Sequence, residues 1–160
     1  MEYGLIGEKL GHSYSQMIHE RLADYRYELK EVAPERLDAF IEARNFRGLN
    51  VTIPYKQAVM KHCAELSPEA MEVGSVNTLI VRPDGSLFGH NTDIDGFIYM
   101  LRRGEIDPAG AKAVILGSGG TSLTARAALT RLGAREIVTV SRKGPVDYAA
   151  LYAEHADAEI

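Results

Sequence analysis

The sequence predicts an α/β protein, and three observations support that fold class. Short apolar segments rich in β-branched residues alternate along the chain with longer segments whose apolar residues recur at helical spacing. A glycine-rich stretch, Gly117–Gly120, stands between one of these strands and the helix that follows. The chain has 160 residues, of which 46% are hydrophobic and 25% charged, so it can form one ordinary globular domain or one and a half small ones.

Composition also limits the expected partners and compartment. The net charge is −4 and no basic cluster is present, so we expect no nucleic-acid surface. The amino-terminal residues lack the features of a signal peptide, and no apolar run approaches the ~20 residues of a membrane span. Cys63 is the single cysteine, so no internal disulfide can form and a reducing cytoplasm is expected. We interpret Cys63 itself as a core or neutral thiol.

Most elements in the first part of the chain carry a recognisable signal. Residues 27–32 alternate in polarity, as a half-buried strand does. Pro34 occupies the favoured first position of a helix, and Ser67-Pro68-Glu69 combines a serine cap with a proline in the first turn. Pro83-Asp84-Gly85 predicts a hairpin turn. The predicted strands are 2–7, 27–32, 48–53, 75–82 and 86–89; the predicted helices are 16–25, one from Pro34 ended by Asn45 and Gly48, one after Pro54, one from Ser67, and 91–103.

The stretch around Pro54 organises this part of the chain. Residues 48–53 are apolar and β-branched enough for a short buried strand, and Pro54 ends its ladder because proline has no N–H to donate. The strand therefore delivers the Thr52 hydroxyl and the Lys56 ammonium to the same rim. Ligands of α/β proteins bind at such strand ends. The alternative is a strand followed by a turn and a solvated lysine.

A second unit begins at residue 111 with a strand–loop–helix–strand succession. The strand 111–116, the loop Gly117–Gly120, the helix 121–132 and the strand 135–140 together form a βαβ unit. In this context the glycine loop predicts a dinucleotide site of the Rossmann type, because glycines let the backbone approach a pyrophosphate at a helix amino terminus. Ser122 stands where the third glycine of the fingerprint is usual, and a purely structural turn is the alternative. Residues 148–160 could begin a further helix.

The end of the second strand bears on the choice of cofactor. A site for NAD places an acidic residue there to accept from the ribose hydroxyls. Here the residues are Ser141-Arg142-Lys143, whose two cations and hydroxyl suit a 2′-phosphate. The sequence therefore favours NADP over NAD, and the alternative is a solvated basic turn.

Polar residues also gather at predicted strand ends and loops of the first part of the chain. Ser13 and Ser15 could act as helix caps rather than ligand groups, and Asp93 could likewise cap the helix 91–103. His12 is interpreted as a loop residue with a packing role. The histidines are not paired at metal-ligand spacing, so no metal is expected. The clusters are Ser13 with Ser15, Thr52 with Lys56, Asn77 with Thr78, and Asn91-Thr92-Asp93.

Several of these segments, in this order and spacing, resemble the consecutive signatures of the shikimate dehydrogenase family, and the resemblance covers essentially the whole chain. It implies NADP-dependent, reversible reduction of 3-dehydroshikimate to shikimate in aromatic amino-acid biosynthesis. The segments are Gly11-His12-Ser13-Tyr14-Ser15, Asn50-Val51-Thr52-Ile53-Pro54-Tyr55-Lys56, Gly74-Ser75-Val76-Asn77-Thr78, Gly89-His90-Asn91-Thr92-Asp93-Ile94-Asp95-Gly96 and Gly117-Ser118-Gly119-Gly120-Thr121.

The resemblance also implies roles for individual residues. Ser13 and Ser15 hold the substrate carboxylate, and Lys56 and Asp93 form the catalytic pair. Ring hydroxyls are contacted by Thr52, Asn77 and Asp93. The residues implied in cofactor binding are Gly117, Ser118, Gly119, Gly120, Thr121, Ser141, Arg142 and Lys143.

Family members are much longer than this chain, so we expect a fragment. Its expected domains are 1–92 for the substrate and 93–160 for a connecting helix and an incomplete Rossmann-type NADP domain. The expected partner is a small-molecule substrate, with a homodimer left open. Two alternatives remain: a relative that acts on quinate, and a non-catalytic shikimate-binding domain.

Overall fold

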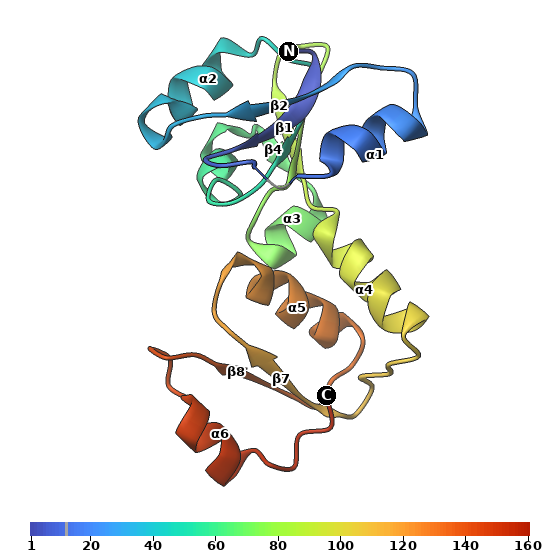
Figure 1. The fold of residues 1–160 in the computed structure, drawn as a ribbon, viewed down its shortest axis with the longest axis vertical. Coiled ribbons are helices and arrows are strands. Elements are labelled where there is room, and N and C mark those ends of the chain that lie inside the picture. The colour runs from blue at the N-terminus through green and yellow to red at the C-terminus, as the bar shows by residue number, and fades with distance from the viewer. Residues whose placement is uncertain (12) are drawn as a thin grey trace. The chain divides into compact units, whose positions relative to one another are not determined.

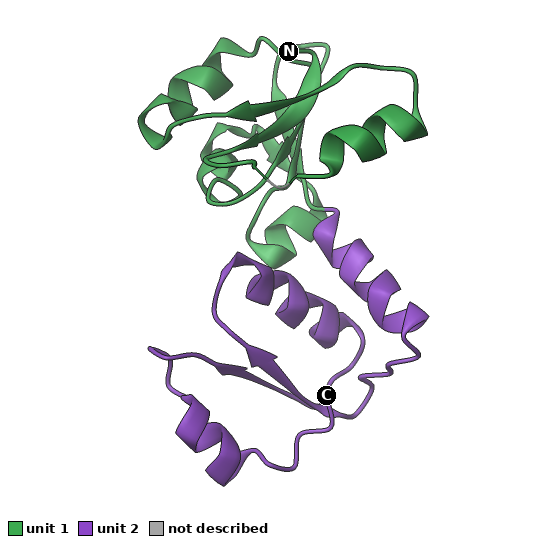
Figure 2. Ribbon diagram, in the orientation of Figure 1, with its two compact units in different colours: residues 1–91 green, residues 92–160 purple. Residues whose placement is uncertain are grey.

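The computed structural model describes residues 1–11 and 13–160, which divide into two units, Met1–Asn91 and Thr92–Ile160 (Figure 2). Both units contain strands and helices, so the predicted α/β class is confirmed (Figure 1). Among the helices of these residues, none has both the length and the apolar character needed to span a membrane.

Unit 1 is built on a six-stranded sheet. Its strands are β1 Tyr3–Gly7, β2 Tyr27–Glu31, β3 Gly48–Val51, β4 Glu65–Leu66, β5 Thr78–Val81 and β6 Leu87–His90. They lie in the order β2-β1-β3-β5-β6-β4. β1 pairs parallel with β2 and β3, whereas β5 pairs antiparallel with β3 and β6. The carboxyl ends of β1 and β3 and the amino end of β5 therefore lie at one edge of the sheet. This edge runs across the strand ends and is distinct from the outermost strands β2 and β4.

Alternation along the strands gives the sheet two apolar faces. Ile6 and Leu79 are fully buried with Ile41 in the larger core on one face. Leu5 and Tyr27 form a smaller cluster on the other face, where α1 packs against β1 and β2. Figure 1 shows α1 and α2 on different sides of these strands. The helices of unit 1 are α1 Ser15–Leu22, η1 Pro34–Arg36, α2 Leu37–Ala43, η2 Ala58–His62 and α3 Pro68–Val73, where η denotes a 3-10 helix.

The helix boundaries predicted for unit 1 are corrected at three places. α1 ends at Leu22 rather than at residue 25, since Tyr25 packs its ring 5.1 Å from Tyr3 instead of continuing the helix. The helix from Pro34 starts as a 3-10 turn, and it ends at Ala43, where the C-cap Arg44 has a left-handed φ of 48°. Gly48 was expected to end that helix, but it is the first residue of β3.

The third correction concerns the segment after Pro54. It forms the 3-10 helix η2, which begins only at Ala58. Tyr55 is 3% exposed and donates its hydroxyl to the Val32 carbonyl, while the Lys56 carbonyl accepts from the Val76 N–H at 2.8 Å. The bond from Val76 takes the Lys56 carbonyl out of the helical pattern, although the Tyr55 carbonyl accepts from the Val59 N–H at 3.0 Å, and η2 begins only at Ala58.

Other local signals are confirmed. The Ser67 hydroxyl caps α3 by accepting from the Ala70 N–H at 3.1 Å. β5 and β6 form the predicted antiparallel hairpin, and Gly85 in its turn has a φ of 81°, which favours glycine. β5 begins at Thr78 instead of residue 75, because the Ser75 carbonyl accepts from the Asn91 side chain at 2.9 Å outside the ladder.

Unit 2 contains the predicted βαβ succession. Its elements are α4 Asp93–Arg103, β7 Lys112–Leu116, α5 Gly120–Arg131, β8 Glu136–Val140 and α6 Tyr148–Glu154. β7 and β8 pair in parallel, and Leu101, Ala113 and Leu129 form the core between the sheet and the helices α4 and α5. The helix expected within residues 148–160 is present as α6. On the side of β7 that does not face β8, the Val114 N–H donates to the Ile160 carbonyl at 2.7 Å.

Candidate substrate and dinucleotide sites

The edge of the unit 1 sheet where β1 and β3 end brings three predicted site residues together. The Thr52 N–H donates to the Ile6 carbonyl at 2.9 Å, which holds Thr52 beside the end of β1. The Val51 N–H donates to the Asn77 carbonyl at 2.8 Å, which places Asn77 against the same strand end. Backbone bonds therefore fix the positions of Thr52 and Asn77.

Lys56 reaches this edge through the turn that follows β3. The Tyr55 N–H donates to the Thr52 carbonyl at 2.9 Å, so the chain turns at once after the strand. The bond from Val76 to the Lys56 carbonyl then holds Lys56 beside the segment that carries Asn77. The predicted grouping of Thr52 and Lys56 at one rim agrees with this geometry.

The serines lie in the loop between β1 and α1. Ser15 is the first residue of α1, and its N–H donates to the Ser13 hydroxyl at 3.2 Å. The loop is anchored by the Leu10 N–H, which donates to a Glu31 carboxylate oxygen at 2.8 Å. Ser13 thus makes a local turn, while the N-cap of α1 is Tyr14. His12, for which a packing role was predicted, lies outside the described residues.

The polar cluster at residues 91–93 divides between the two units. Asn91 is fully buried, and its amide nitrogen donates to the Ser75 carbonyl at 2.9 Å and hydroxyl at 3.0 Å, so it anchors the end of β6. Thr92 is the N-cap of α4 and Asp93 its first residue, so the alternative of Asp93 as the cap is wrong. Lys56 belongs to unit 1 and Asp93 to unit 2, and their pairing stays a prediction.

In unit 2 the glycine loop has the conformation that a phosphate site needs. Gly117 has a φ of 112°, which favours glycine, and its N–H donates to the Val140 carbonyl at 2.8 Å. Gly119 is the N-cap of α5 and has no side chain to occupy the helix amino terminus. Among the described residues, no atom other than those of chain neighbours lies within 4 Å of where a Cβ of Gly117, Gly119 or Gly120 would stand. Residues 118–120 are exposed, so an anion can approach the loop and the start of α5 there, while the Gly117 N–H is already bonded.

Ser122 replaces the third glycine of the dinucleotide fingerprint without opening the loop. Its hydroxyl donates to the Gly119 carbonyl at 2.6 Å, and its N–H donates to the same carbonyl at 2.9 Å. The serine therefore closes the first turn of α5, a role that its position in the fingerprint did not suggest.

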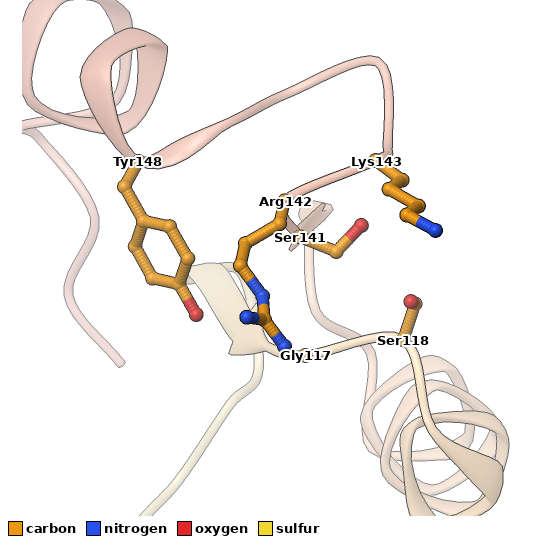
Figure 3. Close-up of a pocket in the computed structure, with 6 residues that line it drawn as sticks. All are labelled: Gly117, Ser118, Ser141, Arg142, Lys143 and Tyr148. Atoms are coloured by element: carbon orange, nitrogen blue, oxygen red, sulfur yellow. The ribbon is translucent and has the colours of Figure 1, made fainter.

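The loop faces a pocket of about 590 Å³ at the carboxyl ends of β7 and β8 (Figure 3). The guanidinium of Arg142 points toward the Gly117 end of the glycine loop in this view. Arg142 and Lys143 are both exposed, and two cations beside accessible backbone N–H groups fit a phosphorylated dinucleotide. Tyr148, at the start of α6, also lines the pocket and was not predicted. The lining residues are Gly117, Ser118, Ser141, Arg142, Lys143 and Tyr148.

Cys63 takes no part in either group of residues. The thiol is half-buried, and its Sγ lies 3.6 Å from the Val59 carbonyl. Burial raises the pKa of the Cys63 thiol, which opposes formation of a nucleophilic thiolate. In residues 1–11 and 13–160, no group of three or more His, Cys, Asp or Glu side chains could hold a metal ion.

Comparison with known proteins places these residues in a family context. Residues 5–79 match the family described as the shikimate dehydrogenase substrate binding domain. A shikimate dehydrogenase (NADP(+)) of Clostridium beijerinckii is 42% identical over 149 residues, covering 88% of this chain and 55% of the relative. The chain thus spans about half the length of the curated relatives it matches.

Solved structures agree with the sequence comparison. Shikimate dehydrogenase 1 of Peptoclostridium difficile is 37% identical with a TM-score of 0.84, and the match covers 91% of this chain and 57% of that one. The shikimate 5-dehydrogenase of Thermus thermophilus, solved with NADP(H) and shikimate, is 33% identical with a TM-score of 0.79, and the match covers 95% of this chain and 60% of that one. The predicted fold, an α/β unit followed by the first βαβ part of a Rossmann-type domain, is confirmed.

Proposed function

Because the chain belongs to the shikimate dehydrogenase family, we propose that it binds shikimate or 3-dehydroshikimate through unit 1 and NADP through unit 2. The reaction that these ligands serve is the reversible reduction of 3-dehydroshikimate to shikimate. One observation carries the proposal: the glycine loop and the pair Arg142 and Lys143 line the same pocket of unit 2. That combination suits a dinucleotide with an additional phosphate.

In unit 1 the proposed substrate contacts follow from the chemistry of the residues at the sheet edge. Ser13 and Ser15 carry hydroxyl groups that can donate to a carboxylate from the loop before α1. Thr52 and Asn77 supply groups that can bond ring hydroxyls, and the backbone bonds at the ends of β3 and β5 keep them adjacent. Asp93 is proposed as a further hydroxyl contact.

Lys56 is proposed as the group that handles the proton. Reduction of a ketone builds negative charge on its oxygen, and a nearby ammonium stabilises this charge and delivers a proton. Asp93 is proposed to hold the ammonium in place. When NADPH is bound, it supplies the hydride.

In unit 2 the glycine loop and the α5 amino terminus are proposed to hold the pyrophosphate, through backbone N–H groups from Ser118 to Thr121. Arg142 can make two charge-assisted bonds to a 2′-phosphate, and Lys143 and Ser141 can add further contacts. Their position at the end of β8 is where a Rossmann-type domain binds the adenosine ribose.

Cofactor binding tests the unit 2 proposal without turnover. We expect the 160-residue chain to bind NADP more tightly than NAD by roughly 5- to 150-fold, the value of one or two charged hydrogen bonds. Arg142→Ala should remove most of this preference in isothermal titration calorimetry. Arg103→Ala is the control, since Arg103 is an exposed cation in the last turn of α4 and does not line the pocket. Equal affinities for NAD and NADP in the unsubstituted chain would overturn the NADP assignment.

Substrate binding tests the unit 1 proposal separately. Shikimate should bind saturably, and quinate, which carries an extra hydroxyl, should bind more weakly. Tighter binding of quinate would favour the quinate-specific alternative. Binding of shikimate by a chain that does not bind NADP would favour the non-catalytic domain, whereas a chain that binds neither shikimate nor quinate lacks the proposed substrate site.

A further inference from the structure

A line of side-chain hydrogen bonds crosses the face of the unit 1 sheet that α1 covers. The Tyr27 hydroxyl on β2 donates to Asn50 Oδ1 on β3 at 2.7 Å. Asn50 Nδ2 donates to Thr78 Oγ1 on β5 at 3.2 Å. The Thr78 hydroxyl in turn donates to Asn77 Oδ1 at 3.0 Å. The line runs from the edge strand β2 to the proposed substrate residue Asn77.

The surroundings determine the direction of these bonds. Asn50 Nδ2 also lies 3.4 Å from the Asn77 carbonyl oxygen. A carbonyl oxygen can only accept, so the Asn50 atom that faces it must be the nitrogen. Asn50 Oδ1 then faces Tyr27, which has to donate.

The amide of Asn77 is oriented by Thr78. Thr78 Oγ1 accepts from Asn50, which leaves its hydrogen for another partner, and in the structure it donates to Asn77 Oδ1. The Nδ2 group is then on the other side of the Asn77 amide. Asn77, which is 7% exposed, therefore acts as a donor toward the group that its nitrogen meets.

The start of the line is shielded from water. Tyr27 is 2% exposed, and the His19 ring of α1 stacks on it with ring centroids 4.0 Å apart and an interplanar angle of 10°. Burial raises the pKa of the Tyr27 hydroxyl far above its ordinary value, so this group stays a donor over the working pH range. Further along the line, Asn50 and Thr78 are half-buried, and together with Tyr27 they line a pocket of about 240 Å³.

We propose that Tyr27, Asn50 and Thr78 form a positioning relay that fixes the Asn77 amide so that it donates to a ring oxygen of the substrate. The inference rests on the proposed function, because that function supplies the ligand. The three relay residues act through Asn77, and Asn77 is the residue that contacts the ligand. The relay selects a ligand oxygen that can accept, such as a hydroxyl lone pair.

Paired substitutions in the 160-residue chain test the relay. Thr78→Val removes the hydroxyl at nearly constant shape, whereas Thr78→Ser keeps it. Tyr27→Phe breaks the first bond, and Tyr25→Phe removes a hydroxyl that bonds His19 in the same aromatic cluster but outside the relay. Thr78→Val and Tyr27→Phe should weaken shikimate binding by roughly 2- to 12-fold, the value of one ordinary hydrogen bond. Thr78→Ser and Tyr25→Phe should stay close to the unsubstituted chain.

Shikimate analogues that each lack one ring hydroxyl separate positioning from general loss of structure. For the analogue without the hydroxyl that Asn77 contacts, Thr78→Val should cause no further loss of affinity, because the interaction it disturbs is already absent. If Thr78→Val lowered the affinity for shikimate and for every analogue by the same factor, the relay would be overturned as a positioning device.

A readout without ligand keeps the test independent of the proposed function. In nuclear magnetic resonance spectra of the free chain, Thr78→Val should shift the side-chain amide signals of Asn77, and Tyr25→Phe should not. If the chain does not bind shikimate, the proposed substrate is wrong, and these spectra decide the relay. Unshifted Asn77 signals in Thr78→Val would overturn it.

Discussion

The two units hold their predicted site residues in different ways. In unit 1, Asn77 is buried and fixed on both sides, by backbone bonds to β3 and by the side-chain line from Tyr27. In unit 2, Arg142 and Lys143 are exposed at the end of a two-stranded sheet. Neutral ring hydroxyls are bound by hydrogen bonds that depend on geometry, which requires fixed partners, whereas a phosphate dianion is recognised largely by charge, which exposed cations supply. We propose that the difference between the units reflects these two kinds of ligand.

The largest expected effect concerns chemistry at the unit 1 edge. Lys56→Ala should lower the turnover of 3-dehydroshikimate by roughly 10²- to 10⁴-fold, the contribution of proton transfer by a positioned group, while shikimate affinity changes far less. The assay uses a hybrid in which the Clostridium beijerinckii relative supplies the part of its length that this chain does not cover.

Lys61→Ala in the same hybrid is the matched control. Lys61 is also a lysine of unit 1, but its ammonium is 2.6 Å from Asp38 in an exposed ion pair. A hybrid that turns over at the same rate with and without Lys56 would show that the proton comes from another group.

A smaller effect is expected when one ion pair in each unit is disrupted. In unit 2, Lys112 is 2.7 Å from Asp157 and 3.6 Å from Glu136, and its side chain is 6% exposed, whereas the Lys61 side chain in unit 1 is 60% exposed. Asp157→Asn should therefore lower the melting temperature at neutral pH more than Asp38→Asn does. The reason is that, among the described residues, only the more distant Glu136 then remains as a carboxylate partner of the buried Lys112 charge.

The pH dependence of this comparison has a defined sign. The bond from Lys112 lowers the pKa of Asp157, and the bonds from Lys61 and His62 lower the pKa of Asp38. A lowered carboxyl pKa stabilises the fold above the unfolded value of about 3.9, and this stability is lost as the pH falls through the folded value. Both variants should therefore approach the unsubstituted chain in thermal unfolding at strongly acidic pH.

The bond to Asp157 also raises the pKa of Lys112. Its stabilisation is complete below the unfolded pKa of about 10.4 and is lost only as the pH rises through the folded value. The proposed difference between the two pairs would be contradicted if Asp157→Asn did not lower the melting temperature at neutral pH, or lowered it no more than Asp38→Asn does.

Unit 2 could be predicted almost residue by residue because its signals are local. β7, the glycine loop, α5 and β8 lie next to one another in the sequence, and apolar periodicity and glycines mark each boundary. The serine cap of α3 and the turn before β6 were predicted for the same reason. In unit 1 the grouping of Thr52 with Lys56 followed from Pro54, although β3 ends already at Val51 and not at residue 53 as predicted.

What the sequence could not predict depends on contacts between distant segments. The 3-10 helix η2 starts late because the Lys56 carbonyl bonds to the distant Val76 N–H instead of to the following turn. Asn50 appeared only as a polar residue within a strand, since its partners Tyr27 and Thr78 lie 23 and 28 positions away. Tyr148 was missed because nothing local marks a tyrosine at a helix start as part of a pocket.

The central claim, that this one chain carries a substrate site in unit 1 and a separate cofactor site in unit 2, is tested most directly by amide chemical shifts. The labelled 160-residue chain is titrated with shikimate and, in a second sample, with NADP. Shikimate should shift signals near residues 13–15, 50–56 and 77–78, and NADP should shift those near 117–121 and 141–143. Two ligands that shift the same set of signals, or that shift none, would contradict the claim.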